Sequence, residues 1–125
     1  MTENPVRWFE IYVQDMARAR RFYETVFATT LQQLNAPAGE LEMWAFPMAM
    51  DRGGCAGSLV KMEGFPSGGN STLVYFACED CTVEAARVAG AGGKLFREKM
   101  SIGEHGFIAL AIDPDGNMLG MHSMK

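Results

Sequence analysis

The sequence contains the same pattern of residues twice, and this repeat constrains the fold more than any other feature. Segments 8–15 and 73–80 are each an apolar, strand-like run that ends in an acidic residue and leads directly into an Ala- and Arg-rich helical stretch. Segments 57–62 and 116–121 also resemble each other. A duplicated unit usually folds as two similar modules that share a core, and the seam between them is a natural place for a ligand.

Length and charge narrow the class of protein. A chain of 125 residues predicts a single domain over residues 1–125. The formal net charge of −4, without a clustered Lys/Arg stripe, argues against nucleic acid or an anionic membrane as a partner. No apolar run approaches the roughly 18 to 20 residues that span a bilayer. The first residues show no secretory signal, so a cytoplasmic location is expected.

The three cysteines, Cys55, Cys78 and Cys81, are an odd number and do not suggest a disulfide scaffold. Cys78 and Cys81 form a C-x-x-C pair. Redox or zinc chemistry would require a thioredoxin-like context or a second pair of ligands, and the sequence has neither. The favoured interpretation is structural: Cys78 ends a strand and Cys81 begins a helix, both as small hydrophobic side chains.

Each half of the chain is predicted to fold as a strand, a helix and then three strands. The first module covers about residues 5–63, a Gly-rich linker about 64–71, and the second module about 72–125. Asp15 and Asp80 are expected to cap the two helices. The expected strands are 6–14, one within 28–40, 41–46, 48–50, 57–62, 72–78, 94–98, 106–112 and 117–122; the expected helices are 16–27 and 80–89.

At this point the chain resembles the vicinal oxygen chelate superfamily, the group of glyoxalase I, bleomycin-resistance proteins and extradiol dioxygenases. The resemblance covers almost the whole chain. It implies an α+β fold in which two tandem βαβββ modules form a half-open barrel of mixed sheet around a cavity, and it implies a homodimer. The residues that carry it are Val13, Asp15, Ala19, Phe22, Tyr23 and the segments 90–94 and 113–117.

The resemblance also implies where a metal would bind. Members of the superfamily often hold one divalent metal through four side chains, two from each module, and the matching positions here are Trp8, Lys61, Leu73 and Gly120. None suits a cation, because Trp and Leu lack a donor, Gly has no side chain and a protonated Lys repels the ion. No cofactor is therefore expected. A divalent metal could bind only elsewhere, and Glu10, His105 and His122 are the candidates.

Strand alternation predicts the walls of the cavity. Aromatic walls with a few polar groups suit a small, partly apolar organic ligand. The side chains expected there are Trp8, Glu10, Tyr12, Leu59, Lys61, Leu73, Tyr75, Ala77, Met118, Gly120 and His122, and His105 lies in a loop that could close over the site.

Glu10 stands out as a carboxylate in an otherwise apolar strand. If it is buried, it must be paired, hydrogen-bonded or protonated. It is either a ligand anchor or general base, or the partner of Lys61 or an arginine in an internal ion pair. His122 is either an acid, base or lone ligand in the cavity, or, with better odds, a structural hydrogen-bonding group near the C-terminus.

Three functional hypotheses follow. The first is a metal-free protein that binds a small organic molecule in the cavity. The second is a lyase, isomerase or dioxygenase that uses an atypical metal site or acid–base chemistry of Glu10 and His122. The third is a regulatory module whose cavity is filled by its own side chains. The missing metal ligands favour the first hypothesis.

Overall fold

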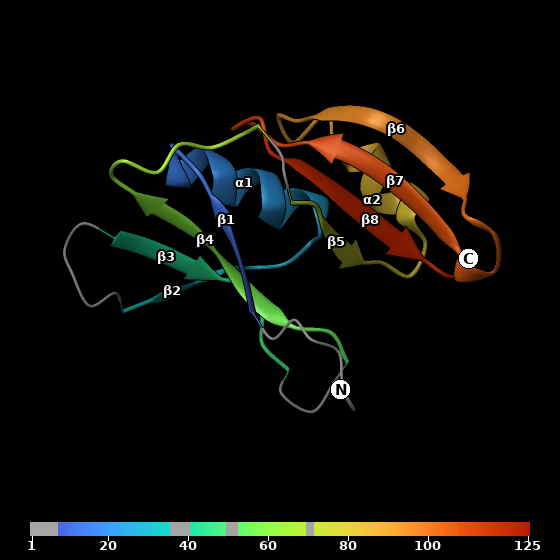
Figure 1. The fold of residues 1–125 in the computed structure, drawn as a ribbon, viewed down its shortest axis with the longest axis horizontal. Helices are drawn as coiled ribbons and strands as arrows, with labels where there is room; N and C mark the ends of the chain where they lie inside the picture. Colours follow the sequence, from blue (N-terminus) through green and yellow to red (C-terminus); the bar gives the residue numbers. More distant parts are fainter. Residues whose placement is uncertain (1–7, 36–40, 50–52, 70–71) are drawn as a thin grey trace.

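The structure is a computed structural model that describes residues 8–35, 41–49, 53–69 and 72–125, and for His105 the backbone alone. The chain forms two successive sets of elements with the same order (Figure 1). The first set is β1 (Trp8–Tyr12), α1 (Met16–Val26), β2 (Gln32–Leu34), β3 (Leu41–Ala45) and β4 (Ala56–Met62). The second is β5 (Val74–Ala77), α2 (Cys81–Arg87), β6 (Lys94–Ser101), the 3-10 turn η1 (Gly103–His105), β7 (Phe107–Ile112) and β8 (Met118–Ser123).

Each set builds one four-stranded sheet, and the two sheets have the same topology. The strand orders are β1-β4-β3-β2 and β5-β8-β7-β6. In both, the first strand pairs in parallel with the last, and the remaining pairs are antiparallel. The predicted pair of βαβββ modules in an α+β fold is therefore confirmed.

The predicted N-caps of both helices are present. Asp15 accepts a hydrogen bond from the backbone N–H of Arg18 at 3.1 Å, and Asp80 accepts one from Thr82 at 3.0 Å. Each satisfies an N–H group that has no partner within the first helical turn. The apolar stripe of α1, including Phe22, Tyr23 and Val26, is fully buried, as its helical spacing predicts.

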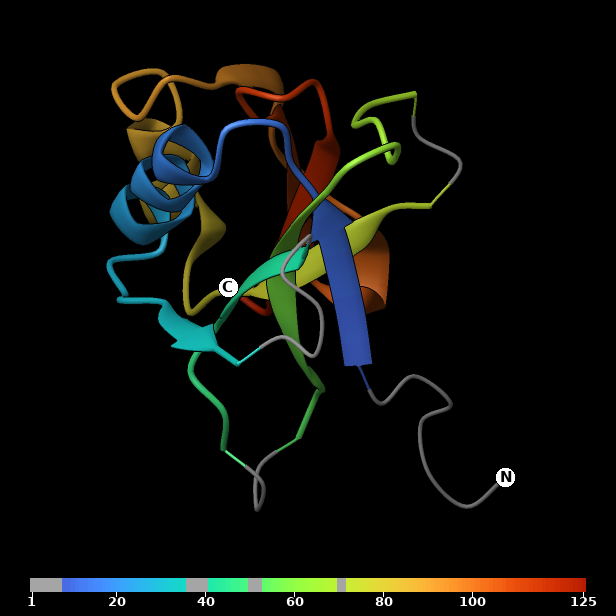
Figure 2. The ribbon, with the colours of Figure 1, turned by 90° about the vertical axis from the view of Figure 1, so that its left-hand side faces the viewer.

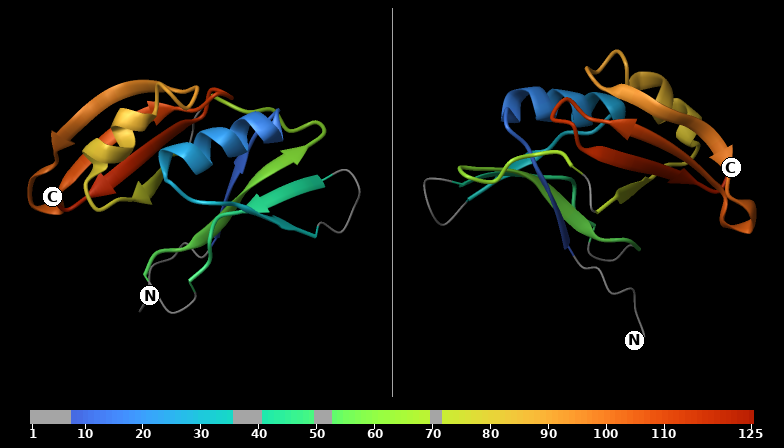
Figure 3. Two further views of the ribbon diagram at one scale, coloured as in Figure 1. Left: turned by 180° about the vertical axis from the view of Figure 1, so that it is seen from behind. Right: turned by 45° about the horizontal axis from the view of Figure 1, so that its top comes forward.

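Both helices lie on the same side of the sheets and pack against each other (Figures 2 and 3). The core fills the space between the helices and the sheet faces turned toward them, and it joins the modules through aromatic rings. Phe76 of β5 contacts Phe9, Tyr23, Phe27 and Phe46 of the first module, with ring centroids 4.6–5.9 Å apart. The opposite faces, turned away from α1 and α2, are called the inner faces below.

The turn between β7 and β8 ties the second module to the first. The buried carboxylate of Asp113 accepts the Tyr23 hydroxyl at 2.8 Å, the Asn117 side-chain amide at 3.0 Å and the backbone N–H groups of Asp115 and Asn117. Asn117 also donates to the Tyr12 carbonyl at 3.0 Å. Burial, and then the charge of Asp113, raises the pKa of Tyr23 well above its usual value, so the phenol remains a donor.

Some local predictions differ from the structure. No strand forms over residues 48–49, and Met50 lies outside the described residues. The first strand ends at Tyr12 rather than at residue 14, and residues 6 and 7 of the predicted strand lie outside the described residues. The loop that contains His105 includes the short turn η1. Pro47 accounts for the first difference, because it removes a backbone donor two residues after β3 ends at Ala45.

Candidate functional site

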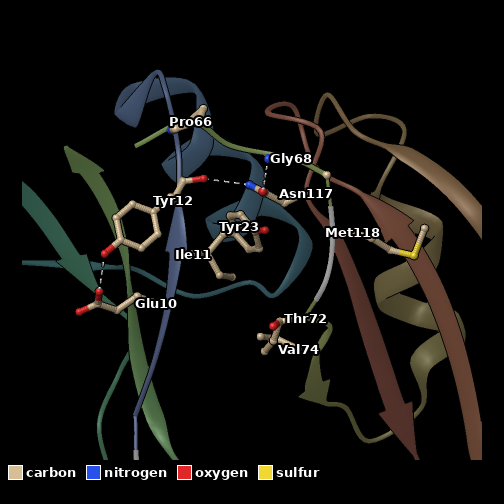
Figure 4. Close-up of a pocket in the computed structure, with 11 residues that line it drawn as sticks. Glu10, Ile11, Tyr12, Tyr23, Pro66, Gly68, Thr72, Val74, Asn117 and Met118 are labelled. Carbon is tan, nitrogen blue, oxygen red and sulfur yellow. Dashed lines mark hydrogen bonds between the residues drawn. The ribbon is translucent and has the colours of Figure 1, made fainter. Parts of the chain in front are cut away.

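A pocket lies between the edge of β1 and the edge of β5, under the linker that joins the modules (Figure 4). Its volume is about 220 Å³, below the roughly 300 Å³ at the lower end of drug-sized ligand sites. It therefore suits a small molecule or part of a larger one. The lining residues are Glu10, Ile11, Tyr12, Tyr23, Pro66, Gly68, Gly69, Thr72, Val74, Asn117 and Met118.

Glu10 is held by its neighbours on the same strand. Its carboxylate accepts the indole N–H of Trp8 at 3.3 Å and the hydroxyl of Tyr12 at 3.0 Å. Residues two apart share one face of a strand, which explains how three successive inner-face side chains meet. Figure 4 shows Glu10 and Tyr12 on one side of β1 and Ile11 on the other, toward Tyr23. Glu10 is exposed rather than buried, so it keeps its charge accessible to a ligand.

Tyr12 complements this carboxylate. Partial burial, followed by the hydrogen bond and the charge of Glu10, raises the pKa of the Tyr12 hydroxyl above its ordinary value. The phenol therefore stays protonated near neutral pH and donates to Glu10. Its ring stacks on Phe65 of the linker, with centroids 5.7 Å apart. The stack positions the phenol beside the pocket.

The prediction that Lys61 and Leu59 share a face with Glu10 is wrong. In the parallel pair of β1 and β4, Glu10 lies opposite Ser58, whereas Leu59 lies opposite Ile11 in the core. Lys61 follows Leu59 by two residues and so lies on the helix-facing side, opposite Glu42. The prediction failed because it aligned the closing strands of the two modules by Gly57 and Gly116. That alignment matches Gly120 with Lys61, three residues beyond Ser58, and a shift by an odd number of residues moves a side chain to the other face of the strand.

In the second module, the structure places Tyr75, Gly120 and His122 on the inner face. Tyr75 pairs with Gly120 and Ala77 with His122, while the intervening Leu119 and Met121 are in the core. The Tyr75 ring covers Gly120 and is 47% exposed. The pocket, however, takes Thr72 and Val74 from this segment, and neither Leu73 nor Tyr75 is among its lining residues.

His122 does not join Glu10. The hydrogen bonds of Glu10 go to Trp8 and Tyr12, and His122 is not among the residues that line the pocket. The side chain of His105 lies outside the described residues. The geometry therefore gives no support to a Glu10–His122 acid–base pair.

The pairing of the strands identifies the equivalent positions in the two modules. Glu10 pairs with Ser58 as Tyr75 pairs with Gly120, so Ser58, rather than Lys61, corresponds to Gly120. The four positions of the metal site implied by the resemblance are then Trp8, Ser58, Leu73 and Gly120. One neutral hydroxyl does not make a site for a divalent cation. Within the described ranges, no group of three or more His, Cys, Asp or Glu side chains is placed to hold a metal.

Several pocket residues were missed from the sequence because they lie on loops or on the edge of a strand. Asn117 is the clearest case, since the turn 113–117 was noted only for its shape. Its side chain accepts from the backbone of Gly68 at 2.9 Å and donates to Tyr12 and Asp113. The sequence did contain one indication of this role, because Asn117 carries a side-chain amide directly before the last strand of the second module.

The C-x-x-C pair has a structural place in the fold. Cys81 is the first residue of α2 and is fully buried, and its backbone N–H donates to Ser123 at 3.0 Å. Burial, and then the charge of Glu84, raises the pKa of the Cys78 thiol to about 12. All three cysteines are free thiols.

Sequence and structure comparisons agree with this architecture. The family model of the Glyoxalase/Bleomycin resistance protein/Dioxygenase superfamily matches residues 6–121. The chain belongs to this superfamily. It is 32% identical over 109 residues to "Putative glyoxylase CFP32" of Mycobacterium tuberculosis and of Mycobacterium bovis. That match covers 87% of this chain and 40% of the relative, so the chain spans less than half of the curated relatives it matches.

Solved structures of the superfamily share the fold. TnmS3, an antibiotic-binding protein from Streptomyces sp. CB03234, aligns over 100% of this chain and 99% of its own, with a TM-score of 0.69 and 23% identity. Glyoxalase I from Zea mays aligns over 95% of this chain and 46% of its own, with a TM-score of 0.73 and 22% identity. At these identities the likeness shows the fold alone.

No helix in the described part of this superfamily member is long and apolar enough to cross a membrane.

Proposed function

We propose that this chain binds a small organic molecule in the pocket between its two modules, without the metal site implied by its family. The observation that carries the proposal is the lining of the pocket. Apolar groups such as Ile11, Val74 and Met118 line the pocket together with the polar pair of Glu10 and Tyr12. Such a lining provides apolar contact together with a few directed hydrogen bonds.

The relatives support this proposal in part. TnmS3, whose structure aligns over nearly all of both chains, is an antibiotic-binding protein. The name of the mycobacterial relatives points instead to glyoxylase activity. Metal-dependent catalysis of that kind would need ligands that Trp8, Ser58, Leu73 and Gly120 do not provide. Binding is therefore the function that the described residues fit best.

The first test is elemental analysis of protein purified without chelator or metal-affinity resin, with thermal melts in Mn, Fe, Co, Ni and Zn. A ligand at about 100 times its dissociation constant stabilises a protein by about 2.7 kcal/mol, so an occupied site shifts the melt. We expect no stoichiometric metal and no shift. One metal per chain with a matching shift would contradict the metal-free proposal.

The second test is a screen of one- and two-ring organic molecules by thermal shift, followed by the Glu10→Gln variant. We expect binders whose affinity falls in the variant, because the amide keeps the shape of Glu10 and removes its charge. Unchanged affinity would rule out Glu10 as an anchor. Lys61→Gln is the matched control, since Lys61 is exposed on the other face.

Assembly and location are also part of the proposal. Exposed Trp8 and Tyr75 leave the inner faces partly uncovered, which favours a homodimer that covers them. The free thiols fit a reducing compartment such as the cytoplasm. Light scattering at several protein concentrations tests the dimer.

A further inference from the structure

The first sheet carries two pairs of tryptophan and glutamate that have the same spacing but lie on opposite faces. On the helix-facing side, Trp44 donates its indole N–H to Glu42 at 3.0 Å. On the inner face, Trp8 donates its indole N–H to Glu10 at 3.3 Å. In both pairs the residues are two apart on one strand. The protein thus contains one local arrangement in two environments.

The helix-facing pair receives a cation from the protein itself. The guanidinium carbon of Arg20, on α1, lies 3.5 Å from the centroid of the Trp44 ring. The negative face of an indole attracts a cation, and a carboxylate hydrogen-bonded to the same ring makes the local potential more negative. The indole of this pair therefore contacts a cation, whose guanidinium is also paired with Glu24 at 3.3 Å.

The inner-face pair receives no such cation from the described residues. The partners of Glu10 are the neutral Trp8 and Tyr12. Arg18, on the helix that follows β1, is bound to Asp115 at 2.6 Å. Glu10 is moreover the one charged residue among the described residues that line the pocket. Within the described part of the chain, the negative charge of Glu10 at the edge of the pocket therefore has no cationic partner.

Ser58 adds an independent sign that a partner is missing. It lies opposite Glu10 on the inner face of β4 and is 0% exposed. Its hydroxyl has no hydrogen-bond partner among the described residues. A buried polar group without a partner costs free energy, so the strand beside Glu10 has an unsatisfied hydroxyl, although Ser58 is not among the residues that line the pocket.

We propose that the site of Trp8, Glu10 and Tyr12 binds an organic cation, an ammonium or amidinium group carried on a small apolar or aromatic body. The cationic group lies on the Glu10 carboxylate beside the two aromatic rings. The apolar body lies against Val74 and Met118, which line the same pocket. This inference rests on the proposed binding function and adds the charge of the ligand. A carboxylate-bearing ligand is repelled by Glu10, and no described lining residue offers it a cation.

The test compares three naphthalene probes of nearly equal size: 1-naphthylmethylamine, 1-naphthylmethanol and 1-naphthaleneacetic acid. Calorimetric titration of the full chain is carried out at neutral pH with each probe. We expect the amine to bind about tenfold tighter than the alcohol, from an exposed ion pair combined with cation–π attraction, and the acid to bind more weakly still. The preference for the amine should shrink between about 0.02 M and about 0.5 M salt.

Matched variants assign the preference to the inner-face pair. Glu10→Gln is expected to make the amine bind like the alcohol, and Trp8→Leu to reduce the preference in part. Glu42→Gln is the control, because it removes the equivalent carboxylate from the helix-facing pair, and it should leave amine binding unchanged. A preference lost equally in Glu10→Gln and Glu42→Gln would overturn the assignment.

The outcomes also separate this inference from the proposed function. Equal binding of all three probes would overturn the preference for a cation and leave small-molecule binding intact. Tighter binding of the acid would have the same consequence. If no probe binds even at millimolar concentration, both the cation site and the proposed pocket function are contradicted for ligands of this size.

Discussion

The two modules have the same strand order and equivalent pairing, yet their inner faces differ in chemistry. In the first module, Trp8, Glu10 and Tyr12 form a hydrogen-bonded polar row beside Ser58. In the second, Tyr75 covers Gly120, which lacks a side chain. The common fold therefore fixes where side chains project, while each module's own residues decide what they can bind. The polar row of Trp8, Glu10 and Tyr12 belongs to the first module, whereas the second places the exposed Tyr75 ring at the equivalent position.

The second module contributes the buried Asp113 carboxylate that binds Tyr23 of the first module. Removing this carboxylate is the change for which we predict the largest loss of stability. Asp113→Ala removes the acceptor of the Tyr23 hydroxyl, of the Asn117 amide and of two backbone N–H groups at the seam. Leaving several buried donors without a partner is expected to cost about 3 kcal/mol of unfolding free energy. Urea denaturation measures it. Asp80→Ala, which removes an exposed helix cap, is the control and should cost less; an equal loss would contradict the role of Asp113.

The second prediction compares two glycines that lie under aromatic rings. A Cβ at Gly57 would lie 2.5 Å from carbons of the Phe9 ring, and that ring is held in the core by Phe46 and Phe76. A Cβ at Gly120 would also meet a ring, but Tyr75 is 47% exposed and can rotate away. We expect Gly57→Ala to cost about 2 kcal/mol and Gly120→Ala less than about 1 kcal/mol.

Thermal and urea denaturation of both variants give these values. Near-UV circular dichroism adds a control, because Gly120→Ala should change the environment of an exposed tyrosine while the core signal remains. Equal costs in the two variants would show that the inner face of the second module is packed as tightly as the core.

The fold was predictable from the sequence because its determinants are local and occur twice. The acidic caps Asp15 and Asp80, the helical spacing of α1 and the turn 113–117 each act within a few residues. The facing of β4 was not predictable from the repeat alone, because register depends on pairing between strands far apart in sequence. The place of Ser58 beside Glu10 therefore required the structure.

The candidate site was predictable only where strand alternation decides it. Trp8, Glu10 and Tyr12 share a face because they alternate along one strand, and this holds whatever the tertiary structure. Asn117, Thr72 and Gly68 join the pocket through loops and the linker. Their positions depend on how the modules dock, which the sequence pattern does not specify.

The third prediction removes the hydroxyl by which the first module differs from the second at the position of Ser58 and Gly120. Ser58→Ala removes a buried hydroxyl that has no partner among the described residues. We expect the variant to be as stable as the natural protein or more stable by up to about 1 kcal/mol, because no hydrogen bond is lost. Thermal unfolding without ligand measures this. A clear loss of stability would show that the hydroxyl already has a partner in solution.

The smallest expected effect concerns the first residue after each opening strand. Cys78 corresponds to Val13: their backbone N–H groups donate to the last strand of their own sheet, to His122 at 2.7 Å and to Val60 at 2.8 Å. A thiol with a pKa of about 12 is ionised to only about one part in ten thousand at pH 8, so Cys78 should react with iodoacetamide far more slowly than the exposed Cys55. Mass spectrometry of labelled peptides measures this difference, and labelling of Cys78 rises with pH as the thiolate forms.

Cys78→Val should keep both the stability and the binding of the protein, since valine fills the equivalent position in the first module. Rapid labelling of Cys78 at pH 8 would show that its thiol is not suppressed by burial. Loss of binding in a folded Cys78→Val variant would show that the thiol has a role that Val13 does not have in the first module.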